Sequence, residues 1–241
     1  LQGALVGAQV ATTMVLMVAV GLLLRGLTAT QTTDPGFEAR DVAFATYDLP
    51  GGGYDPAEAV AFQGRLLDEV RGLPGVEAAA QVITEPLNPD TNEAGIRLPT
   101  QDRAQRRVAD LNGVTPDYFD VVGIPIVRGR AFEDEEMTTT AGVAIVTEST
   151  ARNLWPDQDP IGQTLIMAGF NGDITLEIVG VAGDAQVTVV GQVAPYYLYL
   201  PASPQVAQLL RLVVKSRTDF VSTAAAIRAA AARLDAGLAV Q

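Results

Sequence analysis

The residues of this sequence best suited to chemistry are three aspartates, Asp110, Asp117 and Asp184. Two carboxylates can hydrolyse a bond when an apolar setting raises the pKa of one of them, so that it keeps its proton. No pair of these aspartates stands in such a setting. The sequence also has no histidine and no cysteine, so it lacks the commonest general base, the commonest zinc ligand and thiolate metal ligands. We therefore predict no enzymatic activity, and no catalytic, cofactor-binding or metal-binding residue.

Two charged clusters are the next candidates for a site. The acidic residues Glu133, Asp134, Glu135 and Glu136 could attract a cation, but they lack the alternate spacing and the glycine of a calcium loop. A solvated turn is the preferred interpretation.

Arg103, Arg106 and Arg107 could bind an anionic ligand, but a solvated strand edge is preferred. The net charge of −12 predicts repulsion from nucleic acid and from anionic lipid. We expect no nucleic-acid partner.

The elements that position these residues follow an uncharged, mostly apolar run, 4–24. As an α-helix this run would be about 32 Å long, close to the roughly 30 Å of bilayer hydrocarbon. A cleaved signal peptide fits less well, because no basic residue precedes the run and Arg25 follows it. The sequence therefore predicts a transmembrane helix within residues 1–27, in preference to a buried core helix.

Beyond the run, two segments have the pattern of a strand followed by a helix. Asp55-Pro56-Ala57-Glu58 combines an N-cap, a proline and a capping-box glutamate, and Asp219 is the expected cap of the second helix. Each helix has a single apolar stripe, which can be buried only against a sheet or against the other helix. We expect both helices on one face of one sheet, formed by strands 42–49, 76–83 and 209–215.

The residues between these segments have a different pattern. The region 85–107 is rich in turn residues and is predicted to be a loop or a boundary region. Short strands are predicted at 108–113, 124–128, 143–146, 164–167, 175–181 and 196–200, with short helices at 116–121 and 149–154 capped by Thr115 and Thr147.

Three stretches closely resemble the MacB/FtsX-like ABC transporter permeases: VTPDYFDVVGIPIVRGRAFEDEE (114–136), VAIVTESTARNLWPDQDPIGQTL (143–165) and EIVGVAGDA (177–185). The stretches 9–27 and 34–42 are similar to the first transmembrane helix of that family and its exit. The resemblance is strongest to permeases in which the MacB-like periplasmic core domain is duplicated and no ATPase is fused.

This resemblance implies an α+β fold with an N-terminal transmembrane helix. A ferredoxin-like split β-α-β, porter-like lobe would follow, interrupted by a β-rich inserted lobe. The implied domains are a transmembrane helix at 1–27, a discontinuous porter-like lobe at 28–85 and 205–241, and an inserted lobe at 86–204. The soluble part would be extracytoplasmic, or periplasmic, on the inner (cell) membrane.

The implied partners are the membrane, the remaining transmembrane helices of a longer permease, a separate cytoplasmic ATPase subunit and a second copy in a homodimer. The preferred function is the transmission of conformational change across the membrane, for export or mechanotransmission, without catalysis. The alternative is a membrane-tethered extracytoplasmic sensor or ligand-binding module, which would need a concave pocket with convergent polar groups. A hydrolase built on carboxylates is disfavoured.

Overall fold

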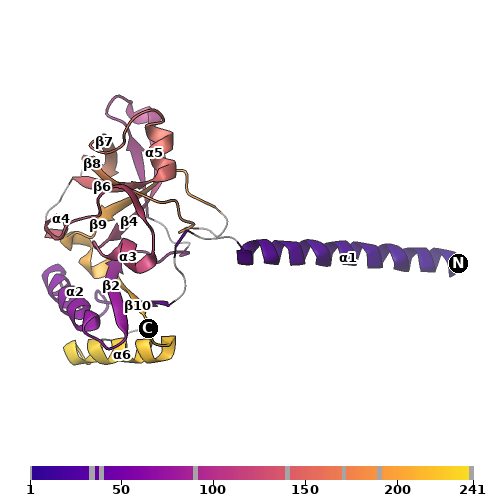
Figure 1. Ribbon diagram of the computed structural model, residues 1–241, viewed down its shortest axis with the longest axis horizontal. Coiled ribbons are helices and arrows are strands. Elements are labelled where there is room, and N and C mark those ends of the chain that lie inside the picture. Colours follow the sequence, from indigo (N-terminus) through magenta and orange to yellow (C-terminus); the bar gives the residue numbers. More distant parts are fainter. Residues whose placement is uncertain are drawn as a thin grey trace. The chain divides into compact units, whose positions relative to one another are not determined.

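The computed structural model describes residues 2–32, 36–37, 41–88, 92–138, 142–169, 172–188 and 192–238. The chain divides into two compact units, Leu1–Pro35 and Gly36–Gln241. The first unit contains helix α1 (Gln2–Thr32), coloured indigo in Figure 1. Over the described residues, no helix combines the length and the apolarity needed to cross a membrane. The membrane span expected within residues 1–27 stays a prediction.

The second unit contains an antiparallel sheet in the order β1 (Val42–Ala45), β10 (Arg211–Ser216) and β2 (Val76–Val82). Helices α2 (Pro56–Arg71) and α6 (Phe220–Leu234) bury their apolar stripes on one face of this sheet, in a single core cluster with the strands. The capping box at Asp55 and the cap at Asp219 fix where the two helices begin. The expected sheet with both helices on one face is therefore confirmed.

Six further strands pair in a closed ring, which defines a small barrel in the upper part of Figure 1. Their order is β4 (Arg107–Val114), β3 (Asn92–Arg97), β7 (Thr164–Gly169), β8 (Gly172–Ala182), β6 (Val143–Thr147) and β9 (Tyr197–Pro201), which pairs again with β4. One core cluster takes apolar side chains from all six strands, and Trp155 and helix α5 (Glu148–Leu154) add to it. The short strand β5 (Ile126–Gly129) pairs with β8.

The sheet and the barrel meet at one strand pair and one aromatic layer. Val82 of β2 pairs with Val114 of β4, and helix α3 (Tyr118–Val122) packs against β2 and β10. Tyr118, Phe119 and Tyr199 form edge-on or tilted ring contacts in this layer and are buried. The fold is mixed α/β. This third core cluster, which we call the aromatic core cluster, takes buried side chains from both the sheet and the barrel.

Several local predictions were wrong. The region 85–107 is not simply a loop, because strand β3 lies within it. Strand β3 has only one branched aliphatic residue, Ile96, and so has low strand propensity. Its pairing with β4 and β7 stabilises it. The acidic turn is instead the start of a short helix, α4 (Asp134–Thr138). Thr115 does not cap α3, whose N-cap is Asp117, and instead its side chain accepts from the backbone N–H of Gln81.

Candidate functional site

The three candidate aspartates do not form a carboxylate pair. Among the hydrogen bonds and ion pairs of the described residues, Asp110 accepts from Thr188, Asp117 pairs with Arg71, and Asp184 binds residues of α5. No partner is shared. Burial raises the pKa of Asp110, and the charge of Glu93, which faces it in the strand pairing, raises it further. Burial is the larger cause, and the like charge of Glu93 on the neighbouring strand adds to it.

The acidic cluster is held by an arginine. The Arg130 guanidinium donates to both carboxylate oxygens of Glu136, at 3.1 and 2.8 Å, and lies 3.4 Å from Glu133. The hydrogen bonds from Arg130 lower the pKa of Glu136. Within the described residues, no three acidic side chains are grouped in the way a metal site needs.

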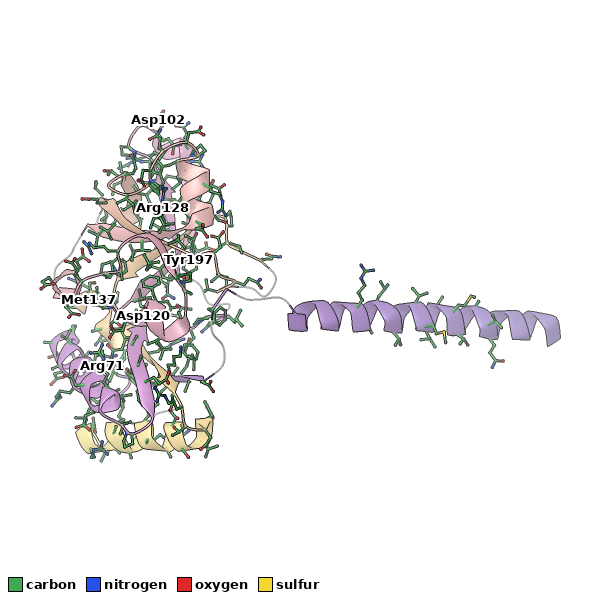
Figure 2. All side chains as sticks on the ribbon, viewed as in Figure 1. Arg71, Asp102, Asp120, Arg128, Met137 and Tyr197 are labelled. Carbon is green, nitrogen blue, oxygen red and sulfur yellow. The ribbon has the colours of Figure 1, made fainter. Side chains whose placement is uncertain are left out.

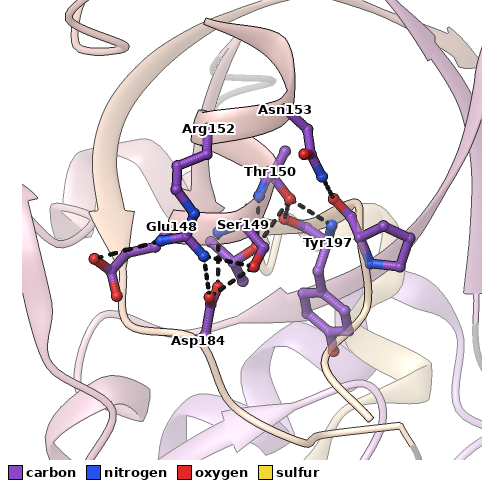
Figure 3. Close-up of polar contacts among 9 residues, drawn as sticks. Glu148, Ser149, Thr150, Arg152, Asn153, Asp184 and Tyr197 are labelled. Carbon is purple, nitrogen blue, oxygen red and sulfur yellow. Dashed lines mark hydrogen bonds and ion pairs between the residues drawn. The ribbon is translucent and has the colours of Figure 1, made fainter. Parts of the chain in front are cut away.

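Asp184, which follows β8, is the centre of a group of hydrogen bonds between distant segments (Figure 3). Its carboxylate accepts from the backbone N–H of Ser149 at 2.8 Å, from Ser149 Oγ at 2.6 Å and from Arg152 Nη2 at 2.7 Å. Arg152 also donates to Ser149 Oγ at 2.9 Å. We call Asp184, Ser149 and Arg152 the Asp184 latch. It ties the end of β8 to the first turn of α5.

The start of the second unit lies directly against this latch. Gly36 has a φ of +78°, and a Cβ built on it would overlap the Asp184 carbonyl oxygen. Only glycine combines this backbone conformation with such a close approach at low cost. Phe37 packs against the aromatic core cluster. The latch therefore joins the end of β8 to the start of α5, and residues 36–37 pack beside it.

The buried tyrosines offer no proton-transfer group. Burial raises the pKa of Tyr118 and of Tyr199 well above the usual value, so both hydroxyls stay protonated at neutral pH. The arrangement fits a packed core.

The described residues form an apolar groove of about 600 Å³, a concave feature of the kind that a ligand-binding module needs. It lies between barrel strands and the short helix η2 (Pro204–Leu209). Ile83, Leu111, Met167 and Ile174 contribute apolar surface, and Glu93 is the one charged residue among those that line it.

Neither the latch nor the groove could be predicted from the sequence. Ser149 and Asp184 are 35 positions apart, and Gly36 is much farther from both, so only the fold brings them together. Asp184 was a candidate for hydrolysis, and the structure places it instead in a network of hydrogen bonds between segments.

Comparison with known proteins identifies the class to which this fold belongs. Residues 10–234 match the family model of the MacB-like periplasmic core domain. The chain is 26% identical over 171 residues to the macrolide export ATP-binding/permease protein MacB of Escherichia coli K12, covering 69% of this chain and 24% of that protein. It is 27% identical over 132 residues to the Vibrio parahaemolyticus MacB, covering 55% of this chain and 18% of that protein. The chain thus spans about a fifth of the length of these relatives.

Solved structures show the same fold. The periplasmic region of MacB from Actinobacillus actinomycetemcomitans aligns with a TM-score of 0.57 at 13% identity, over 88% of this chain and 93% of that one. The extracellular domain of the ABC-type transporter YknZ from Gram-positive bacteria aligns with a TM-score of 0.54 at 16% identity, over 83% and 99%.

These matches place the chain among the extracytoplasmic domains of ABC transporter permeases. The chain belongs to the MacB-like periplasmic core domain family, which confirms the family predicted from the sequence.

Proposed function

We propose that this chain is the extracytoplasmic core domain and first transmembrane helix of an ABC-transporter-type permease, and that it transmits conformational change without catalysis. The proposed domains are a membrane anchor at 1–27, a porter-like lobe at 28–85 and 205–241, and an inserted lobe at 86–204. The family supports the permease assignment. The lack of histidine and cysteine supports the absence of catalysis.

The observation that carries the transmission role is the contact of residues 36–37 with the Asp184 latch and the aromatic core. Residues 36–37 are the first described residues after α1. A displacement of this entry segment would act directly on Asp184, and through Ser149 and Arg152 on α5 and the barrel. Closely packed elements move as rigid bodies under such a displacement, because their cores resist deformation.

The membrane anchor is supported by the uncharged run 4–24 and by the apolar side chains that the described part of α1 exposes: Val10, Met14, Val15, Leu16, Met17, Val18, Val20, Leu22 and Leu23. We propose that it lies in the inner membrane, with the second unit outside the cytoplasm. The proposed partners are further transmembrane helices, a cytoplasmic ATPase subunit and a second copy of the chain.

Single cysteines test this topology cleanly, because the chain has none of its own. In intact cells, a membrane-impermeant maleimide is expected to label Thr33→Cys and Arg103→Cys and to leave Val10→Cys unlabelled. Labelling of Thr33→Cys only after the cells are lysed would overturn the orientation. Labelling of Val10→Cys in intact cells would overturn the span.

A membrane-tethered ligand-binding module is the second candidate, and the apolar groove favours it. If it is correct, the apolar fluorophore 1-N-phenylnaphthylamine binds the chain saturably, and Leu209→Asp at the groove abolishes binding. Val221→Asp, at an exposed apolar position on α6 away from the groove, is the control. Equal loss in both variants, or no saturation, would exclude a ligand site in the groove.

A further inference from the structure

Four arginines gather at one end of the second unit, in an otherwise acidic chain. We call Arg97, Arg103, Arg106 and Arg107 the arginine cluster; they come from the end of β3, the short helix η1 (Arg103–Gln105) and the start of β4. Figure 2 shows the neighbouring Asp102 at the end of this unit opposite to Arg71. The cluster is a local concentration of positive charge on a protein with a net charge of −12.

One carboxylate of the chain already occupies the centre of the cluster. Asp173, at the start of β8, accepts from Arg97 Nη2 at 3.1 Å and from Arg106 Nη2, and Arg103 Nη2 lies 3.6 Å away. The hydrogen bond from Arg97 lowers the pKa of Asp173, and the charges of Arg106 and Arg103 lower it further. The geometry therefore favours carboxylates.

Gln101 supplies two further acceptors: its carbonyl oxygen accepts from Arg97 Nη1 at 2.8 Å, and its Oε1 accepts from Arg107 Nη1 at 3.2 Å. The Nε atoms of Arg97 and Arg106 are buried and have no hydrogen-bond partner among the described residues. The Arg103 side chain is 75% exposed, and its Nη2 lies 3.6 Å from Asp173, at the distance of an ion pair and beyond that of a hydrogen bond. A guanidinium has five N–H donors in a planar fork that matches a carboxylate, so Arg103 is available to an outside acceptor.

The surroundings indicate the kind of acceptor. Val108 pairs with Gly95 of β3, against which the Arg106 side chain lies, and Val108 is 64% exposed. An arginine beside an exposed aliphatic side chain is typical of protein interfaces. The Arg107 guanidinium, on the other side of β4, lies over the Tyr196 ring at 5.8 Å. A bilayer or a nucleic acid carries a long-range negative field that the rest of this acidic chain would oppose.

We propose that the arginine cluster is a docking surface for a carboxylate-rich segment of a partner protein, with Arg103 pairing with its acidic side chains and Val108 contacting its apolar ones. This surface is independent of the Asp184 latch and of the proposed transmission role.

The test is binding of a fluorescein-labelled peptide of alternating Glu and Leu to the full chain, followed by anisotropy at low salt. Saturable binding that weakens with added salt is expected. Arg103→Ala should weaken it about three- to fivefold, the range for an exposed charge pair. Arg65→Ala, which removes the same charge from exposed α2, should leave the affinity unchanged.

The proposal would be overturned by no saturable binding, by equal weakening in Arg65→Ala, or by displacement of the peptide when inorganic phosphate carries the same total charge. Vesicles containing phosphatidylglycerol provide the last comparison. Arg103-dependent binding to these vesicles that exceeds binding to the peptide would assign the cluster to a membrane surface and contradict a protein partner.

Discussion

Replacement of Asp184 by alanine removes the acceptor on which the latch depends. The carboxylate is 21% exposed and accepts three hydrogen bonds from Ser149 and Arg152. After the substitution, the N–H and hydroxyl of Ser149 lose their acceptor close to the barrel, whereas Arg152, 62% exposed, can turn to water. The loss of stability should therefore come mostly from Ser149.

The magnitude follows from these exposures. A hydrogen bond to a charged group contributes about 1.5–3 kcal/mol to stability when its partners cannot rehydrate. At this partly exposed site the freed groups can rehydrate, so the loss of all three bonds should cost about 2 kcal/mol in total. Asp184→Asn keeps one acceptor and should cost about 1 kcal/mol. Arg152→Ala removes only an exposed ion pair and should cost about 0.5 kcal/mol or less.

Thermal unfolding followed by circular dichroism measures the series. For a domain of this size, 1 kcal/mol corresponds to about 2–4 °C in Tm, so Asp184→Ala should lower Tm by about 4–8 °C and Arg152→Ala by about 2 °C or less. Asp157→Ala, which removes an exposed aspartate after α5, is the control and should leave Tm unchanged. A Tm for Asp184→Ala that equals that of Asp157→Ala would refute the latch.

Three further predictions concern stability. Gly36→Ala should cost about 1–3 kcal/mol, because it adds a steric overlap with the Asp184 backbone carbonyl to the strain of a positive φ. Gly53→Ala, at a similar φ but in open space, should cost less. Equal losses of stability in denaturant unfolding would contradict the close approach of Gly36 to Asp184. Asp110→Asn should stabilise the protein by about 0.5 kcal/mol at pH 7 by removing a like charge from the strand pair. Because the folded-state pKa of Asp110 is raised, the stability gained by Asp110→Asn should shrink as the pH falls toward the ordinary pKa of aspartate. A gain in stability that grows on acidification would contradict this prediction. Glu136 has a depressed pKa, so its pairing with Arg130 should stabilise the fold above the ordinary glutamate pKa of about 4.3 and lose that effect as the pH falls further. Glu136→Gln should reduce the fall of Tm on acidification, and an unchanged fall of Tm would contradict the ion pair.

The parts of the fold that the sequence predicts are those determined locally. Helix α2 is marked by its capping box and α6 by its Asp219 cap, and each has an apolar stripe at helical spacing. The strands β2, β8 and β10 carry runs of small or branched apolar residues that are buried in the core. Capping and periodicity are properties of a few neighbouring residues, so they can be read without the tertiary structure.

The parts that it does not predict depend on distant partners. Strand β3 has little strand propensity and forms because β4 and β7 pair with it. Closure of the barrel needs the parallel pairs β4 with β9 and β6 with β8, which connect segments far apart in the chain. The latch likewise depends on one aspartate meeting one serine across the fold, and neither residue is unusual in its local sequence.

The most direct test of the proposed transmission is a pair of spin-label distances in the proposed full-length permease dimer, reconstituted in nanodiscs with the proposed ATPase subunit. Labels at Val60 on α2 and Arg103 on η1, both exposed, report the distance within one copy, and labels at Arg103 alone report the distance between two copies. Addition of ATP and Mg²⁺ should shift the distance between copies and leave the distance within a copy unchanged. Two results would contradict rigid-body movement of the domain with its proposed anchor. One is that neither distance responds to nucleotide, and the other is that the distance within one copy changes as much as the distance between copies.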